Sequence, residues 1–354
     1  MAAGTQREAS GQTLSGSQAM TSSERILIVG PAWVGDMVMA QSLFITLKQQ
    51  DADCIIDVVA PAWSVPLLQR MPQVHEAIEL AVGHKQLGLL TRYRLGRQLR
   101  SRHYDRAIVL PRSYKSALVP FFAGARRRTG YRGEHRYGVI NDMRALDKRV
   151  LYQTVQRYVG LAYDNLASAP PVPYPQLSIN SSNQQALLKK LGLNQDKRVI
   201  GLMPGAEYGP AKQWPVEYFQ QLAGMLVAQG CQVWVFGSAK EVSLGEAIRQ
   251  GQPAVSNLCG KTSLVDAVDL IALTANNVTN DSGLMHIAAA TGRPLVAIYG
   301  SSDPAYTPPL SDRAIILYQG LDCSPCFARQ CRFGHTRCLT EIMPRAVLKQ
   351  LTKG

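Results

Sequence analysis

Three polar turns, each placed where a predicted strand gives way to a predicted helix, carry the side chains best suited to chemistry. The first turn holds the carboxylate Asp36, the second holds Lys212, and the third holds Asp281-Ser-Gly283 followed by His286. A carboxylate can take a proton from a hydroxyl nucleophile. A lysine, or the backbone amides at the start of a helix, can hold phosphate oxygens. The turns therefore offer one candidate general base and two candidate anion sites.

Each of these residues also has a structural explanation. Asp36 could be an ordinary helix N-cap, Lys212 a solvated loop lysine, and His286 a packed helix histidine. The turn from Gly30 to Asp36 has neither the glycine spacing of a dinucleotide fingerprint nor a Walker lysine. A hydride-transfer enzyme and a P-loop nucleotidase are therefore poorly supported, and the roles of the three turns stay open at this level.

The elements that must position these turns alternate between strands and helices. Helical stretches run from about Asp36 to Gln50, after Pro215, and from Gly283 to Ala290. The predicted strands are Arg25–Gly30, Ile55–Ala60, Arg106–Pro111, Arg198–Met203, Gln232–Phe236, 277–279 and Leu295–Tyr299. This alternation predicts parallel sheets covered by helices, in which ligands bind beyond the carboxyl ends of the strands.

A proline-rich stretch divides the chain. Residues 168–175 contain four prolines, which favour neither a helix nor a central strand. We therefore expect two doubly wound domains, 24–170 and 171–354. Residues 1–23 are rich in Ser, Gly and Thr and lack the apolar core of a secretory signal, so they predict a disordered extension. No window approaches 18 uninterrupted apolar residues, and we expect a cytoplasmic protein.

The chain has a net charge of +13, and most of the excess lies in its first half. Residues 24–170 contain 21 Lys and Arg against 12 Asp and Glu. A basic face favours an anionic partner, which could be nucleic acid, anionic lipid or a phosphorylated substrate; a merely solvated surface is the alternative.

Four of the seven cysteines crowd into one segment, 323–338. Their spacing is C-x2-C-x4-C-x6-C, formed by Cys323, Cys326, Cys331 and Cys338. Such a set could enclose tetrahedral zinc or an iron–sulfur cluster, or could be four reduced thiols. Disulfides are disfavoured in a cytoplasmic protein.

Four segments, in the same order and spacing, resemble the heptosyltransferases of glycosyltransferase family 9. They are Pro31-Ala-Trp-Val-Gly-Asp36, Pro204-Gly-Ala-Glu-Tyr-Gly-Pro-Ala-Lys-Gln-Trp-Pro215, Phe236-Gly-Ser238 and Thr279-Asn-Asp-Ser-Gly-Leu-Met-His286. Residues 60–63 and 115–124 are similar to the branch of the family that adds a second heptose. The resemblance runs from about Ile26 to the C-terminus.

The resemblance implies a GT-B fold, in which two Rossmann-like domains face a central cleft. It implies an ADP-heptose donor bound mainly by the second domain and a heptosyl-Kdo2-lipid A acceptor bound mainly by the first. The product is part of the lipopolysaccharide inner core. Transfer would invert the anomeric centre and need no catalytic metal or other cofactor. The enzyme would work in the cytoplasm, in peripheral contact with the inner membrane.

The resemblance also assigns roles to residues. Asp36 would be the base, and Lys212 would offset charge on the departing ADP. The donor would be bound by Gly205, Lys212, Glu241, Asp281, Ser282, Gly283 and His286. We further expect Lys115, Arg126, Arg127, Arg128 and Arg132 to dock the anionic acceptor, because guanidinium groups suit phosphates and carboxylates. The competing readings are a related transferase for another sugar or acceptor position and, from another class, a basic nucleic-acid-binding protein.

Overall fold

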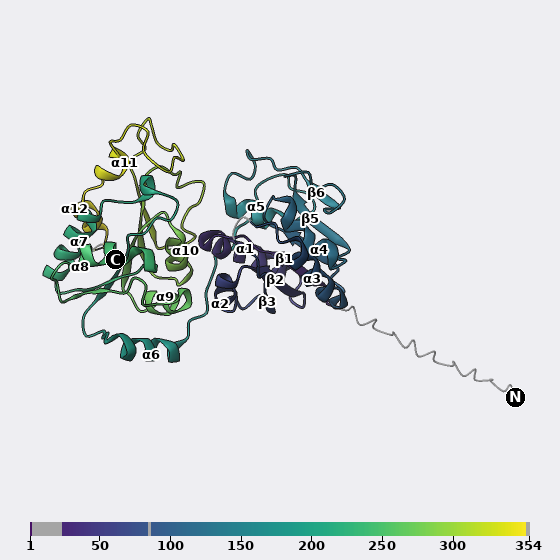
Figure 1. Cartoon of the computed structure of the whole chain (residues 1–354), viewed down its shortest axis with the longest axis horizontal. Helices are drawn as coiled ribbons and strands as arrows, with labels where there is room; N and C mark the ends of the chain where they lie inside the picture. Colours follow the sequence, from purple (N-terminus) through teal and green to yellow (C-terminus); the bar gives the residue numbers. More distant parts are fainter. Residues whose placement is uncertain (2–22, 84–85, 352–354) are drawn as a thin grey trace.

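Two six-stranded parallel sheets organise the computed structural model, which describes residue 1 and residues 23–83 and 86–351 (Figure 1). The predicted extension therefore lies almost entirely outside the described residues. The first sheet has the order β3-β2-β1-β4-β5-β6. Its strands are β1 Arg25–Val29, β2 Ile55–Ala60, β3 Glu76–Glu79, β4 Arg106–Val109, β5 Arg127–Tyr131 and β6 Asp142–Arg144.

The second sheet repeats this architecture with the order β12-β11-β10-β7-β8-β9. Its strands are β7 Val199–Met203, β8 Gln232–Val235, β9 Val255–Asn257, β10 Asn276–Asn280, β11 Leu295–Tyr299 and β12 Ala314–Tyr318. Strands β1 and β7 are apolar runs buried on both faces, as parallel sheets covered by helices require, whereas the equally buried β10 is largely polar, with the sequence Asn276-Asn-Val-Thr-Asn280. The predicted pair of doubly wound parallel sheets is confirmed, and the predicted strands end within two residues of the observed ones.

Helices cover both sheets (Figure 1). Those of the first lobe are α1 Val34–Gln50, α2 Val65–Leu68, α3 Leu89–Leu99, α4 Leu118–Phe122 and α5 Thr154–Gly160. Those of the second lobe are α6 Ser181–Leu191, α7 Val216–Ala228, α8 Val242–Arg249, α9 Leu264–Ile271, α10 Gly283–Ala290, α11 Arg337–Thr340 and α12 Pro344–Leu351. Short 3₁₀ turns occupy Ala62–Ser64, Arg100–Arg102, Tyr114–Ala117, Pro210–Lys212 and Ala239–Glu241. Among the described residues, no helix combines the length and apolar character that crossing a membrane requires.

The two lobes share a hydrophobic core. Helix α1 lies beside α10 at the centre of the molecule (Figure 1), and one cluster of buried side chains includes Met37 and Leu43 of α1 with Met285 and Ile287 of α10. An ion pair also joins the lobes: Arg70 lies 2.6 Å from the fully buried carboxylate of Asp269. The two lobes are therefore held together by side-chain packing and an ion pair as well as by the connecting chain.

The connecting chain is itself anchored. The proposed boundary between residues 170 and 171 falls between α5 and α6, in a stretch with neither helix nor strand. The buried side chain of Gln41, on α1, accepts from the backbone N–H of Gln176 at 3.0 Å and donates to its carbonyl oxygen at 2.6 Å. The connection therefore runs against the interface between the lobes.

Candidate active site

Asp36 lies just beyond the carboxyl end of the central strand β1. Its helix, α1, begins at Val34, and the N-cap position is occupied by Trp33 without a side-chain capping bond. Asp36 is therefore the third helical residue, and the alternative that it is the N-cap is wrong. Its carboxylate is placed in the first turn, where the helix dipole favours negative charge.

The surroundings of Asp36 tune its proton affinity. Burial raises the pKa of Asp36 to about 6. A hydrogen bond from the Tyr158 hydroxyl and the positive charge of Lys212 act in the opposite direction and lower this pKa, but burial has the larger effect. Tyr158 comes from α5 of the same lobe, whereas Lys212 comes from the second lobe. A carboxylate with this pKa is ionised at neutral pH yet basic enough to accept a proton from a hydroxyl in the transition state.

Lys212 is held by a buried carboxylate of its own lobe. Its ammonium nitrogen lies 2.5 Å from Asp281, which also accepts a hydrogen bond of 2.5 Å from the Ser302 hydroxyl. Asp281 and Ser302 are buried. The ammonium also lies 5.0 Å from the ring centroid of Tyr208. Lys212 thus presents a fixed positive charge at the carboxyl edge of the second sheet.

The turns that carry Asp36 and Asp281 touch each other. A side chain at Gly35 would place its Cβ 2.6 Å from the ring carbon Cδ2 of His286, and one at Gly283 would place it 2.9 Å from Cβ of Val34. Only glycine allows this approach. The structure therefore brings the predicted base and the predicted phosphate-binding turns together at the junction of the lobes.

His286 faces this junction from inside α10. It is buried, and burial lowers its pKa to about 4; nearby Asp281 opposes that shift and Lys212 adds to it. The imidazole is therefore neutral at physiological pH, and it packs against the backbone of Gly35. This contact supports the structural explanation for His286, that it holds the two turns in register.

Gly205 and Glu241 meet at the ends of β7 and β8. The Glu241 carboxylate accepts a hydrogen bond of 2.6 Å from the Ser238 N–H and lies against Gly205, leaving no space for a side chain there. The turn before Lys212 is also fixed, because the buried Asn280 side chain donates to the Pro204 carbonyl at 2.8 Å. The residues predicted to bind the donor therefore lie at the edge of the second sheet that is formed by the carboxyl ends of its strands.

The five basic residues predicted for the acceptor do not lie together. Arg126, Arg127 and Arg128 stand at the beginning of β5, which is the amino edge of the parallel sheet and the edge opposite Asp36. Arg132 follows the end of β5, and Lys115 follows β4, so these two lie at the carboxyl edge. The five residues predicted for the acceptor therefore form two groups at opposite ends of the parallel strands.

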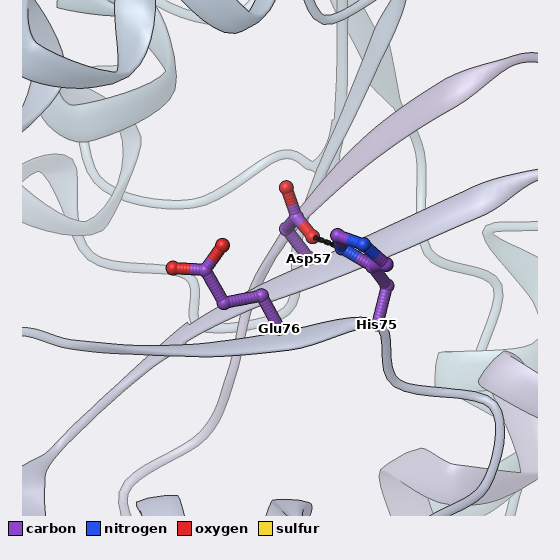
Figure 2. A group of neighbouring side chains, drawn as sticks. All are labelled: Asp57, His75 and Glu76. Carbon is purple, nitrogen blue, oxygen red and sulfur yellow. Dashed lines mark hydrogen bonds and ion pairs between the residues drawn. The ribbon is translucent and has the colours of Figure 1, made fainter.

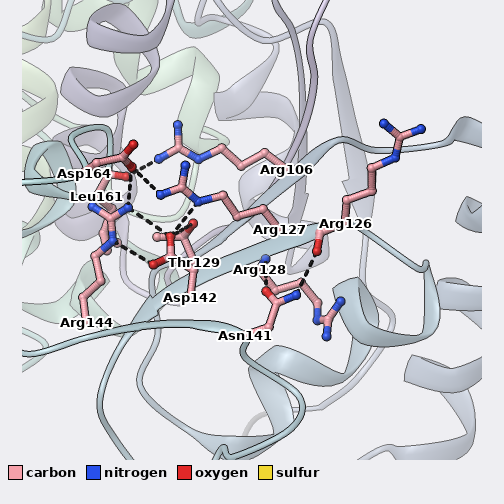
Figure 3. A network of polar contacts seen from close by, with 10 residues as sticks. All are labelled: Arg106, Arg126, Arg127, Arg128, Thr129, Asn141, Asp142, Arg144, Leu161 and Asp164. Atoms are coloured by element: carbon pink, nitrogen blue, oxygen red, sulfur yellow. Dashed lines mark hydrogen bonds and ion pairs between the residues drawn. The ribbon is translucent and has the colours of Figure 1, made fainter.

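Two of the arginines at the amino edge are committed to internal contacts. Arg127 pairs with Asp142 at 2.8 Å and also with Asp164 (Figure 3). Arg128 donates to the carbonyl oxygens of Val139 and Ala125 at 2.8 and 2.7 Å. These bonds tie β5 to its neighbours and give Arg127 and Arg128 structural partners, and docking of the acceptor by Arg126–Arg128 stays a prediction.

The four clustered cysteines line one small hollow beside Ala211 and Ser301. All four are partly buried free thiols. Hydrogen bonds from backbone amides, that of Thr336 foremost, lower the pKa of Cys331. Among the described residues, however, no three of these sulfur atoms lie within 4.8 Å of one another. As they stand, the thiols therefore fit the reduced state better than a formed metal site.

A different group, Asp57, His75 and Glu76, does bring three ligand atoms within 4.8 Å (Figure 2). The Asp57 carboxylate already accepts from the Tyr104 hydroxyl at 2.6 Å and from Arg102 at 3.1 Å. Arg102 also donates to Glu76. The Arg102 guanidinium supplies the positive charge that a metal ion would otherwise bring, so these residues form an internal ion-pair network.

Two residues at the site were not predicted from the sequence. Tyr158 lies on a helix far along the chain from Asp36, and Ser302 follows β11. The strand-end rule could have indicated Ser302, because it comes two residues after Gly300. No pattern in the sequence indicates Tyr158.

Comparisons with known proteins agree with this geometry. The family model "Glycosyltransferase family 9 (heptosyltransferase)" matches residues 92–337. Lipopolysaccharide heptosyltransferase 2 of Escherichia coli K12 is 46% identical over 338 residues, covering 92% of this chain and 97% of that protein. Lipooligosaccharide heptosyltransferase 2 of Haemophilus influenzae is 52% identical over 305 residues, covering 82% and 88%. The solved structure of E. coli ADP-heptose LPS heptosyltransferase II superposes with a TM-score of 0.83 at 45% identity, covering 93% and 98% of the two chains. The expected GT-B fold is confirmed.

Proposed function

Since the chain belongs to glycosyltransferase family 9, the heptosyltransferases, we propose that it transfers L-glycero-D-manno-heptose from ADP-heptose to heptosyl-Kdo2-lipid A. One observation carries the proposal: a carboxylate with a raised pKa, Asp36, lies within the electrostatic reach of Lys212 from the other lobe. A base from one lobe facing a cation from the other is the arrangement that a transfer between two bound substrates requires.

The proposed reaction is a single displacement with inversion. Asp36 takes the proton of the attacking acceptor hydroxyl, and the hydroxyl oxygen bonds to C1 of the heptose. The bond between C1 and the phosphate oxygen breaks, and ADP leaves with the electron pair. Lys212 stabilises the negative charge that grows on that phosphate. Inversion needs only one protein carboxylate, because no covalent enzyme intermediate forms.

The donor diphosphate is proposed to bind at the beginning of α10. The backbone amides of Ser282 and Gly283 open this helix, whose dipole favours an anion there. Lys212 would contact the same phosphates. Glu241 is the proposed partner of the ribose hydroxyls, supported by its place beside Gly205 at the carboxyl edge.

We retain Lys115 and Arg132 as partners of acceptor phosphates or carboxylates, because both follow strands at the edge where Asp36 lies. Since the acceptor is carried on a lipid, we also propose that the enzyme acts in the cytoplasm as a peripheral protein on the inner membrane.

The proposed steps use only side chains of this chain and need no cofactor. A structural zinc ion at Cys323, Cys326, Cys331 and Cys338 stays a separate proposal, supported by their convergence on one hollow. Binding would have to draw the sulfur atoms closer together. Metal analysis of protein purified without chelators decides between zinc and reduced thiols.

Transfer is tested by incubating the protein with ADP-heptose and a defined heptosyl-Kdo2-lipid A acceptor. The expected result is release of ADP and a gain of one heptose in the acceptor, measured by mass spectrometry. Transfer of a different sugar, or to a Kdo2-lipid A acceptor alone, would indicate the related-transferase alternative. RNA binding without any turnover would indicate the nucleic-acid alternative.

Replacing Tyr158 with phenylalanine should move the acid limb of the pH–rate profile to higher pH. The Tyr158 hydroxyl lowers the pKa of Asp36, so its loss leaves burial less opposed and raises that pKa. Asp36 is active only when ionised, so activity is lost at a higher pH as the solution is acidified. Well above this limb, kcat should stay within a few fold of the wild type.

The matched control is Tyr163→Phe, which changes another partly buried tyrosine in the same apolar cluster. Its profile should equal that of the wild type. An unchanged acid limb in Tyr158→Phe would show that the hydroxyl does not act on the base.

A further inference from the structure

Apolar side chains gather on the outer face of the first lobe, where α3 lies beside α4. Leu87, Leu89 and Leu90 are 54, 52 and 58% exposed, and Tyr93 and Phe121 are 43 and 40% exposed. Isolated exposed apolar residues are ordinary, but a group of large ones rimmed by charge marks an interaction surface. We call these five residues the α3–α4 patch.

The patch is built rigidly. The ring of Tyr93 packs edge-on against Phe122 at 5.0 Å, and Phe122 packs against Phe121 at 5.3 Å. Gly96 allows α3 to approach α4 closely, because a side chain there would meet Cβ of Phe122 at 2.5 Å. Leu89, Leu90 and the exposed rings are therefore presented by two helices in contact, and Leu87 lies just before α3.

Positive charge predominates around the patch. The segment 86–103 contains five arginines and no acidic residue. Arg94, Arg97 and Arg100 are exposed, and Arg126, whose side chain is 81% exposed, pairs with Asp105 at 3.5 Å. Exposed apolar residues beside arginines favour an anionic membrane surface, because buried apolar area and attraction to anionic lipids both strengthen such binding.

The orientation of α3 connects the patch with the acceptor edge. Helix α3 follows β3 and leads back to β4, so its apolar beginning lies toward the carboxyl edge of the sheet. The ammonium of Lys115 donates to the Gln86 carbonyl at 3.1 Å, which joins the start of the patch to the loop that follows β4. The apolar end of α3 is thus near the proposed acceptor residues, and its arginines extend toward the opposite edge.

We propose that the α3–α4 patch docks the enzyme on a bilayer of anionic phospholipid, with the leucines and aromatic rings in the interface and the arginines on the headgroups. This inference rests on the proposed function, whose acceptor is lipid-linked. A second copy of the chain is a poor occupant, because it would bring arginine against arginine. An anionic bilayer complements both the charge and the apolar surface.

Vesicle flotation of the full-length chain tests the surface without requiring turnover. Vesicles of phosphatidylethanolamine and phosphatidylglycerol should carry the wild type upward, and high salt or vesicles of phosphatidylcholine should carry it about tenfold less. Leu89→Ser with Leu90→Ser, and separately Arg94→Glu with Arg97→Glu, should each lower the bound fraction at least fivefold.

Matched controls change the same residue types in the second lobe. Ile315→Ser with Ile316→Ser alters a pair of exposed apolar residues, and Arg293→Glu with Arg345→Glu makes the same change of charge. Both controls should float like the wild type. Far-UV circular dichroism and thermal unfolding verify that every variant is folded.

Transfer assays then separate docking from chemistry. The patch variants should turn over detergent-dispersed acceptor at the wild-type rate but lose about tenfold on acceptor embedded in vesicles. Wild-type binding that ignores lipid charge, or patch variants that float normally, would overturn the proposal. So would a dimer in sedimentation that Leu89→Ser with Leu90→Ser dissociates while flotation is unchanged. Failure of the proposed transfer reaction would leave the flotation results standing.

Discussion

Replacing Asp36 with asparagine is expected to lower kcat for heptosyl transfer by about 10²- to 10⁴-fold, the usual contribution of a positioned general base. The amide has nearly the same shape and can still accept a hydrogen bond, but it cannot take the proton of the acceptor hydroxyl. Binding of ADP-heptose should change little, because Asp36 lies on the first lobe. Single-turnover rates and calorimetric donor binding measure the two effects separately.

The control is Asp53→Asn, an exposed carboxylate in the loop after α1. It should leave both rate and binding unchanged. Full activity in folded Asp36→Asn protein would remove Asp36 from the role of base.

The same carboxylate sets the expected pH dependence of the wild type. Its pKa of about 6 means that the ionised, active form is present above that pH and is lost as the solution is acidified through it. The value of kcat/KM should therefore fall below about pH 6, with a limb that Asp36→Asn lacks. His286 should not contribute to this limb, because its pKa of about 4 keeps it neutral there.

Lys212→Ala is expected to cost about 10²- to 10³-fold in kcat, comparable to the loss of one group that stabilises charge in a transition state. The variant removes the cation proposed to meet the departing phosphate. It also leaves the buried carboxylate of Asp281 without its ion-pair partner, beside the site proposed for the dianionic donor. Both changes destabilise the negative charge that grows on the departing phosphate in the transition state.

Lys240→Ala provides a comparison within the same lobe. Lys240 pairs with Glu207 on the surface, where its side chain is 75% exposed, so its loss should have no measurable effect on rate. A Lys212→Ala enzyme with normal kcat and only a raised KM for ADP-heptose would show that Lys212 binds the donor without assisting its departure.

The placement of Asp36, Lys212 and Asp281 was accessible from the sequence for a physical reason. Each lies in a turn that follows a predicted strand, and parallel strands present such turns at one edge. The alternation of strands and helices therefore predicted the parallel sheets and the edge of each sheet at which these residues lie. It could not predict which turn of one lobe would touch which turn of the other.

The arginines of β5 show where the pattern failed. The strand Arg127–Tyr131 contains two arginines, a threonine and a glycine, so it lacks the apolar run that indicates most of the predicted strands. Because the sequence did not predict β5, it did not show which residues lie at either end of this strand. Arg126–Arg128 were therefore grouped with Arg132, although the length of β5 separates them. The tyrosine beside Asp36 was missed because α5 meets α1 only through tertiary packing.

The core shared by the lobes was missed for a related reason. The sequence predicted helix α1 but not its surroundings: Met37–Phe44 is buried without interruption because α1 lies between its own sheet, α5 and α10. A continuous apolar run such as Met37-Val-Met-Ala40 is the signal for a helix buried on all sides.

The packing of α1 on α10 has a consequence for how the chain can be divided. Either lobe produced alone would expose the apolar side chains that now face the other helix, together with half of the Arg70–Asp269 pair. The halves should therefore unfold as one cooperative unit and be poorly soluble apart. Hybrid enzymes that exchange donor lobes among relatives should take α1 and α10 from the same parent. The packing of these two helices, rather than the proline-rich connection, forms the main interface between the lobes.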